Sequence, residues 1–146
     1  DFQLTSFLKL VRARLEDRNS VVRGYALTAC YDLLGKKAIP VIKKWEQTKD
    51  VRNRVTALAL DYIETQAPDV LKRLRHILLR RNCHFGHRYV VMNTFDHYLD
   101  MKYHPEIIAL FEDVLNKVRS LPKNRRNNMD KGIADFLDRW KGVSAH

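Results

Sequence analysis

The stretch Leu34-Gly35-Lys36-Lys37-Ala38-Ile39-Pro40, continued by Glu46 and then Val51-Arg52, decides the fold. A glycine suits the end of one helix, and a proline suits the first turn of the next. An acidic residue then precedes the Val-Arg pair that opens a further helix. The stretch therefore predicts consecutive short helices joined by tight turns.

The same arrangement recurs along the chain. A shift of 29 residues places Val22-Arg23 on Val51-Arg52. A later pair of helices matches with a shift of 37, which places Pro68 on Pro105. Self-similarity at such periods is typical of repeat proteins, in which each unit is one helical hairpin. The unequal shifts indicate that the repeats are degenerate.

Apolar residues recur at helical spacing along almost the whole chain, and no segment alternates with period two for long. The connections are short, so neighbouring helices should be antiparallel. Asn19 or Ser20 is expected to cap the second helix, and Asp50 the fourth. We expect helices over residues 4–16, 21–34, 37–47, 50–64, 68–81, 86–100, 105–118 and 125–140.

These motifs resemble the short HEAT-like repeat, with the best agreement over residues 15–81. The resemblance implies an all-α fold, a right-handed α-solenoid (superhelix) of about four antiparallel helix pairs of the HEAT-like or ARM type. It also implies that Asp17 pairs with Arg23, and Glu46 with Arg52, to fix the turns. We expect residues 1–146 to form a single HEAT-like domain, or a segment of a longer array.

The chain carries 27 Lys+Arg and 17 Asp+Glu, a net charge of +10. Two acid-free stretches, residues 71–94 and 115–128, together hold +11, which leaves −1 for the remainder. Each stretch spans a turn, and turns line up along one edge of a solenoid, so we expect a basic edge that attracts an acidic partner. Its expected binding residues are Lys72, Arg73, Arg80, Arg81, Arg88, Lys123, Arg125 and Arg126.

The predicted function is a non-catalytic binding scaffold whose basic edge docks an acidic protein surface. The alternative is binding to a nucleic-acid backbone, because arginine outnumbers lysine 8 to 3 in the two stretches and binds phosphate bidentately. Only Phe85 and Tyr89 could stack on bases there, which disfavours sequence-specific RNA recognition. A third reading is that the basic side chains merely keep one face solvated.

A second resemblance concerns residues 85–92, Phe-Gly-His-Arg-Tyr-Val-Val-Met, followed by Tyr98-Leu99-Asp100. They are similar to a helix in HEAT-like DNA glycosylases of the alkylation-repair (alkylpurine) type. That family binds the duplex backbone along a basic concave face and excises alkylated bases. No catalytic residue carries over, because the family's catalytic aspartate and aromatic wall have no match in this sequence.

Other chemistry has little support in the sequence. No Gly-rich phosphate loop, nucleophile elbow or His-Glu-x-x-His motif is present, so we expect no cofactor and lean against an enzyme. Cys83, His84 and His87 lie within five residues, but no fourth ligand follows at a familiar spacing, so no metal is expected. Asp32, Asp61 and Asp96 recur near helix ends and are interpreted as solvent-facing or helix-orienting residues. Core roles are expected for Phe111, Phe136 and Trp140.

The sequence also bears on location. No apolar run approaches the about 20 residues that span a bilayer, so membrane insertion is not expected. The two cysteines, Cys30 and Cys83, form no disulfide framework, which favours a reducing, intracellular compartment: the cytoplasm, or the nucleus in a eukaryote.

Overall fold

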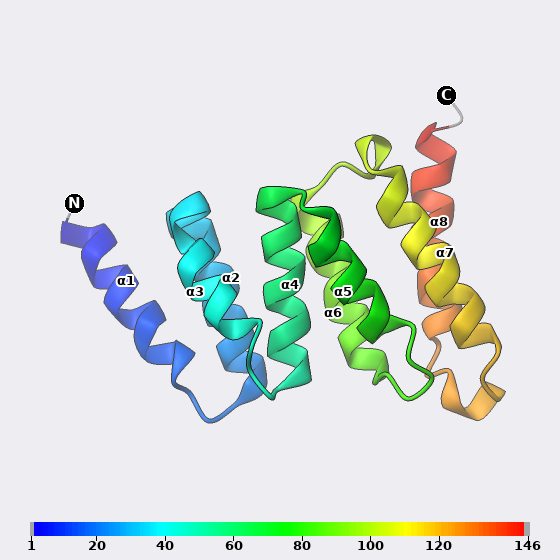
Figure 1. Ribbon diagram of the computed structural model, residues 1–146, viewed down its shortest axis with the longest axis horizontal. Helices are drawn as coiled ribbons and strands as arrows, with labels where there is room; N and C mark the ends of the chain where they lie inside the picture. Colours follow the sequence, from blue (N-terminus) through cyan, green and yellow to red (C-terminus); the bar gives the residue numbers. More distant parts are fainter. Residues whose placement is uncertain (1, 145–146) are drawn as a thin grey trace. The chain divides into compact units, whose positions relative to one another are not determined.

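The structure, a computed structural model, describes the backbone of residues 2–144 and the side chains of residues 5–141. Within these residues all regular secondary structure is helical and no strand is present, which confirms the all-α prediction (Figure 1). The α-helices are α1 (Phe2–Leu15), α2 (Ser20–Leu34), α3 (Ile39–Trp45), α4 (Val51–Thr65), α5 (Pro68–Leu78), α6 (Phe85–Tyr98), α7 (Pro105–Arg119) and α8 (Met129–Ser144). Short 3₁₀ helices are η1 (Gly35–Ala38), η2 (Met101–Tyr103) and η3 (Lys123–Arg125).

Most helix boundaries agree with the expected ranges to within two residues, but α5 ends early and α8 begins late. The Leu78 carbonyl at the end of α5 accepts a hydrogen bond from the Arg88 side chain, which satisfies this carbonyl where the helix stops. Before α8, Asn127 and Asn128 have φ angles of 51° and 60°, in the left-handed region that a right-handed helix excludes. The predicted start of the last helix at Arg125 is therefore wrong.

The predicted helix caps are confirmed. Asn19 caps α2, because its side-chain oxygen accepts from the amide of Val21 at 2.8 Å. Asp50 caps α4 by accepting from the amide of Asn53 at 3.2 Å. Each side chain satisfies an amide that has no partner inside the helix, which fixes where the helix begins. Gly35 ends α2 with a φ of 55°, a conformation that favours glycine.

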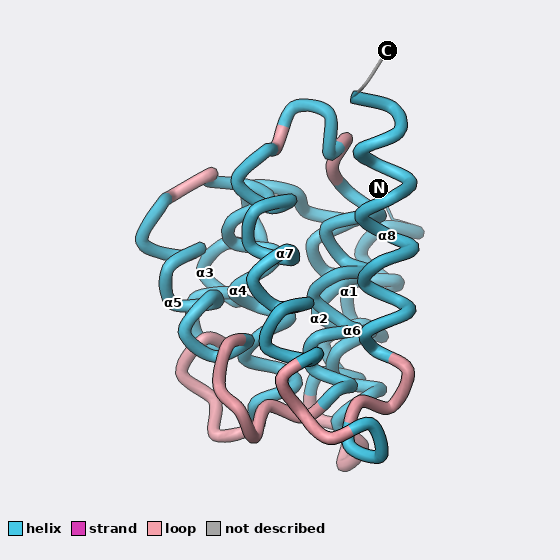
Figure 2. The backbone as a smooth tube through the Cα atoms, turned by 90° about the vertical axis from the view of Figure 1, so that its right-hand side faces the viewer, coloured by secondary structure: helices cyan, strands magenta, loops and turns pink. Residues whose placement is uncertain are grey.

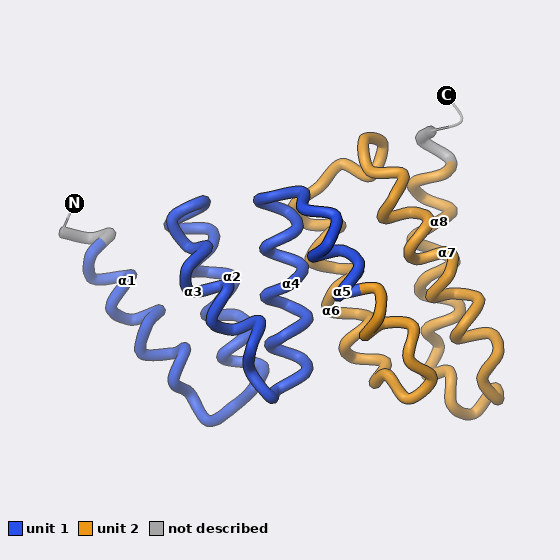
Figure 3. Tube along the Cα trace, in the orientation of Figure 1, with its two compact units in different colours: residues 1–74 blue, residues 75–146 orange. Residues whose placement is uncertain are grey.

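The chain folds as two compact units, and the division falls inside α5 (Figure 3). Unit 1 contains the chain up to Leu74, and unit 2 contains the chain from Arg75 onward. Within the described residues, no helix is long and apolar enough to cross a membrane. A single HEAT-like domain over residues 1–146 stays a prediction.

In unit 1, α4 is the central helix. It packs against both α2 and α3, and α2 packs against α1. Residues 55–62 of α4 are all buried, including Asp61, so this helix is enclosed on every side. The α1–α2 and α3–α4 turns lie at the same end of unit 1 (Figure 1), where Arg23 and Asp50 form an ion pair between them.

In unit 2, α7 packs against α8. The rings of Phe111 and Phe136 meet edge to face with centroids 5.5 Å apart, which confirms their predicted place in the core. Trp140 is half-buried, and its indole nitrogen donates to Asp96 at 2.9 Å. Because Arg139 also pairs with Asp96 at 2.7 Å, this aspartate orients α8 against α6, as predicted.

The loops that join α5 to α6 and α7 to α8 lie at the same end of unit 2 (Figure 2). Both loops belong to the acid-free basic stretches of the sequence. The fold therefore brings the turns of these two stretches together within one unit.

Candidate anion-binding site

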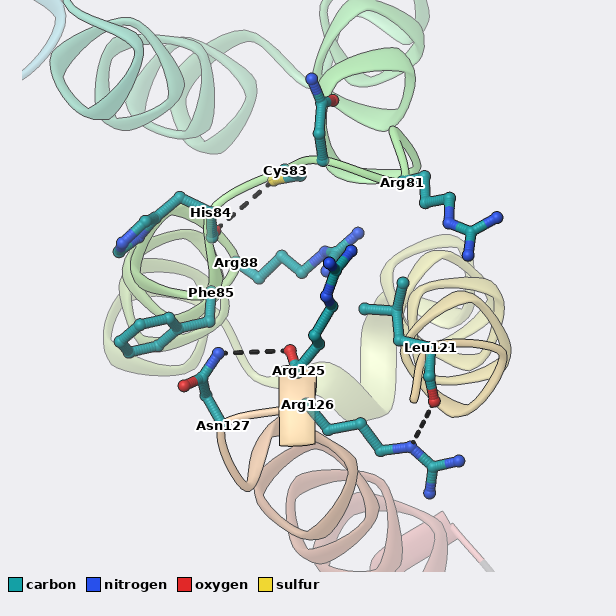
Figure 4. Close-up of a pocket in the computed structure, with 10 residues that line it drawn as sticks. Arg81, Cys83, His84, Phe85, Arg88, Leu121, Arg125, Arg126 and Asn127 are labelled. Carbon is teal, nitrogen blue, oxygen red and sulfur yellow. Dashed lines mark hydrogen bonds between the residues drawn. The ribbon is translucent and has the colours of Figure 1, made fainter. Parts of the chain in front are cut away.

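The two basic turns of unit 2 line a half-open cavity of about 470 Å³ (Figure 4). The loop after α5 and the start of α6 form one wall, and the loop between α7 and α8 forms the other. Among the residues that the structure describes, no carboxylate lines this cavity. Its lining residues are Arg81, Asn82, Cys83, His84, Phe85, Arg88, Leu121, Arg125, Arg126 and Asn127.

Arg88 is the most deeply buried of the lining arginines, with only 2% of its surface exposed. It is the fourth residue of α6, and its guanidinium reaches back to the end of the preceding helix. Nε donates to the Leu78 carbonyl at 3.0 Å, and Nη2 donates to the Arg80 carbonyl at 2.8 Å. The first bond satisfies the carbonyl at the end of α5, and the second is an additional donor to a carbonyl that also accepts from the Cys83 amide at 3.1 Å. Burial lowers the pKa of Arg88, and no described carboxylate forms an ion pair with it.

Arg126 fixes the second turn in the same way. Its Nε donates to the Leu121 carbonyl at 2.9 Å, and Nη2 donates to the Arg119 carbonyl at 2.8 Å. Asp130 lies 3.5 Å from its Nη1. Arg88 and Arg126 were both expected to bind a partner directly, but two nitrogens of each donate to main-chain carbonyls and so hold the walls of the cavity.

Arg81 and Arg125 are exposed and line the same cavity. In Figure 4 the Arg125 side chain points into the middle of the cavity, as does that of Arg88. The Asn127 side chain donates to the Arg125 carbonyl at 3.2 Å and so holds this loop in place. Among the described residues, neither Arg81 nor Arg125 has a carboxylate partner, so their guanidinium groups are available to a ligand.

The other expected binding residues lie elsewhere. Arg80 and Lys123 are exposed but do not line the cavity. Lys72 and Arg73 belong to unit 1, where Arg73 lies 3.6 Å from Glu46. The structure therefore brings together half of the predicted basic residues. The sequence analysis missed Asn82, Leu121 and Asn127, whose only signal is that they flank the basic residues within the two turns.

The prediction that Arg23 forms an ion pair with the Asp17 carboxylate is wrong. Arg23 donates to the main-chain carbonyl of Asp17 at 2.8 Å, while its ion pair is with Asp50 at 2.6 Å. The carboxylate of Asp17 instead accepts from the amide of Asn19 at 2.8 Å. Arg23 does fix the turn, but it does so because the carbonyls there need donors.

The predicted pairing of Glu46 with Arg52 is also wrong. Glu46 is buried, and its closest cation is Arg73. Burial is the main cause that raises the pKa of Glu46 to about 8, and the neighbouring Asp61 raises it further. The Oε1 atom of Glu46 is buried and accepts no hydrogen bond. A protonated Glu46 would act as a donor toward Asp61, which accounts for the missing donor.

Asp61 holds α3 against α4, which confirms its predicted helix-orienting role. It is fully buried, accepts from Lys43 at 2.7 Å and accepts from the Thr65 hydroxyl at 3.1 Å. Burial acts to raise its pKa, but the hydrogen bonds from Glu46, Lys43 and Thr65 outweigh burial and lower it. Both carboxyl groups are closed off from solvent, so this pair is structural.

The candidate metal ligands take local roles. The Nδ1 atom of His84 accepts from the amide of Gly86 at 3.0 Å, and its ring stacks on Phe85 with centroids 4.6 Å apart. Burial raises the pKa of the Cys83 thiol. Over the part of the chain that the structure describes, no group of three or more His, Cys, Asp or Glu residues is placed to hold a metal ion.

No protein-family model matches this chain, and no curated protein or solved structure matches it either. Its function therefore has to be argued from its own contacts and charges.

Proposed function

We propose that this protein is a HEAT-like α-solenoid that works as a non-catalytic, intracellular binding scaffold and docks an acidic protein on its basic edge. One observation carries the proposal: of the described residues, four arginines and no carboxylate line one cavity in unit 2. The centre of the basic edge is accordingly Arg81 and Arg125, with Arg88 and Arg126 behind them.

The cavity is suited to binding because its charge is held in place before a partner arrives. The clamps made by Arg88 and Arg126 fix the two turns that carry Arg81 and Arg125. A preorganised site loses less conformational entropy on binding than a flexible one. Guanidinium groups also form paired hydrogen bonds with carboxylates, which makes an acidic side chain a fitting ligand.

A nucleic-acid backbone is the alternative partner, because arginine also binds phosphate diesters. Duplex DNA presents its phosphates as a continuous row, and proteins match that row with many separate contacts. The described arginines instead converge on one concave site, which favours a single anionic side chain. The protein-docking proposal is therefore preferred.

The test compares fluorescein-labelled peptides, random in sequence but half Asp or Glu, with a labelled DNA duplex. Fluorescence anisotropy would measure binding to the wild type and to the double variant Arg81→Glu/Arg125→Glu. We expect the acidic peptides to bind the wild type and to lose about 100-fold or more in affinity for the variant, because two attractive contacts become repulsive.

The matched control is Lys36→Glu/Lys37→Glu, which makes the same change in net charge at two exposed residues of unit 1. We expect it to retain most of the affinity. Circular dichroism would establish that both variants keep their helices. Equal losses in the two variants, or tighter binding of the duplex than of the acidic peptides, would contradict the proposal.

A further inference from the structure

Arg88 is a buried cation whose charge no carboxylate balances. Two of its nitrogens donate to main-chain carbonyls, and its Nη1 forms no hydrogen bond with any described residue. Leaving a charged group under-satisfied in a protein interior is costly unless something compensates it. In Figure 4 its guanidinium group points into the cavity, where a bound anion would provide that compensation.

The surroundings of Arg88 add positive charge. Arg81 and Arg125 line the same cavity without acidic partners, and both are exposed enough to move toward a ligand. Helix α6 begins at Phe85, which also lines the cavity, and the positive end of its dipole favours an anion there. A ligand with a single negative charge would leave most of the positive charge in this cavity unbalanced.

The size of the cavity and its uncharged lining residues indicate what kind of molecule carries the anion. A volume of about 470 Å³ is larger than one phosphate group needs. Phe85 and Leu121 supply apolar surface, and the amides of Asn82 and Asn127 supply both hydrogen-bond donors and acceptors. This combination suits a phosphorylated side chain together with the peptide backbone that carries it.

We propose that the cavity of unit 2 recognises the phosphate monoester of a phosphorylated serine or threonine on the partner protein. The inference rests on the proposed function and specifies the partner's chemistry. A phosphate monoester carries nearly two negative charges at neutral pH and three acceptor oxygens. Arg81 and Arg125 bind its oxygens from the two walls, and the Nη1 of Arg88 donates from the floor.

The test uses three labelled heptapeptide libraries with identical random flanks and a central serine, glutamate or phosphoserine. Random flanks make the result independent of any one partner sequence. We expect the phosphoserine library to bind at least about tenfold more tightly than the glutamate library, because a dianion meets three convergent guanidinium groups. Lowering the pH from 7.5 to 5 should remove most of this preference, because the phosphate then loses its second charge.

Two neighbouring arginines provide a matched pair of variants. Arg81 lines the cavity and Arg80 does not, although both are exposed. We expect Arg81→Gln to weaken binding of the phosphoserine library about tenfold, and Arg80→Gln to change it less than twofold. Equal losses would overturn the assignment to the cavity.

The outcomes separate the inference from the function on which it rests. If the glutamate and phosphoserine libraries bind equally, the phosphate inference fails and the acidic-protein scaffold stands. If no library binds, both fail. A last outcome is that adenosine monophosphate or a DNA duplex displaces the phosphoserine library at concentrations below those at which the library itself binds. The site would then bind a small phosphate ester or a nucleic acid, and the inference would be overturned.

Discussion

Arg23 in unit 1 and Arg88 in unit 2 are each the fourth residue of a helix, and each donates to main-chain carbonyls of the segment that leads into that helix. Their electrostatic surroundings differ. Arg23 lies 2.6 Å from the carboxylate of Asp50, whereas no described carboxylate pairs with Arg88. Arg23 is partly exposed, and Arg88 is almost completely buried.

The difference separates a structural turn from a candidate site. An arginine clamp satisfies the carbonyls of a helix end wherever it occurs. When a carboxylate lies beside the arginine, as Asp50 does beside Arg23, it neutralises the positive charge that would otherwise attract a ligand. Where the acid is missing, as at Arg88, the same clamp leaves a positive charge facing a cavity.

The α3–α4 turn shows when the clamp is not needed. Arg54 is the fourth residue of α4, but its Nε is buried without a hydrogen-bond partner. The carbonyls that end α3 are already occupied, because the amides of Glu46, Gln47 and Thr48 bond back to them. A backbone turn can therefore replace the side-chain donor.

The largest expected effect on stability is that of Arg88→Ala. It should lower the free energy of unfolding of unit 2 by about 3 kcal/mol, because it takes the side-chain donor from the buried Leu78 carbonyl and empties a large buried volume. Arg23→Ala should cost unit 1 less, about 2 kcal/mol, since water can reach that turn. Urea denaturation would measure both, with Trp45 reporting on unit 1 and Trp140 on unit 2.

Each tryptophan would be observed after the other is replaced by phenylalanine. Arg88→Lys is the control for packing, because it retains a charge and much of the volume but cannot reach two carbonyls in the same geometry. A cost below about 1 kcal/mol for Arg88→Ala would show that the clamp does not hold this turn.

The buried acids of unit 1 give a smaller effect, which depends on pH. The pKa of Glu46 is about 8 in the folded chain and is ordinarily 4.5. Between these values the unfolded chain releases this proton and the folded chain keeps it, so the stability that Glu46 contributes is fully present below pH 4.5 and is lost as the pH rises toward 8. The slope for one proton is at most about 1.4 kcal/mol per pH unit.

We therefore expect unit 1 to lose about 2 kcal/mol of stability between pH 5 and pH 7. Glu46→Gln mimics the protonated acid, so it should make this part of the pH profile flat and should stabilise unit 1 at pH 8. Glu16→Gln, at an exposed residue of the same unit, is the matched control and should keep the wild-type profile. An unchanged slope in Glu46→Gln would show that another group releases the proton.

Much of the fold could be predicted from the sequence, because its signals are local. Helical periodicity, the caps at Asn19 and Asp50, and the core positions of Phe111 and Phe136 on their helix faces each depend on residues of one helix or one turn. The Asn127-Asn128 pair also carried a local signal, since asparagine tolerates the left-handed conformation better than most residues, but the helical pattern outweighed it.

The candidate site was less predictable, because the charges along a sequence do not reveal which arginine side chains will donate to main-chain carbonyls. The basic stretches identified the correct turns, and Arg81 and Arg125 do line the cavity. Arg88 looks the same in the sequence, yet its position in α6 directs it to the carbonyls of another helix end. Only the tertiary packing distinguishes a side chain that also holds the wall of the cavity from one that is available to the ligand alone.

The most direct test of the central claim is to follow the arginine Nε–H signals by NMR while O-phosphoserine is added to the wild-type chain. If the two basic turns of unit 2 form one anion site, the signals of Arg81, Arg88 and Arg125 will shift and saturate with a common dissociation constant. The signals of Arg23 and Arg80 will stay in place. A uniform, unsaturable drift of all exposed arginines, or no shift at Arg81 and Arg125, would contradict the account.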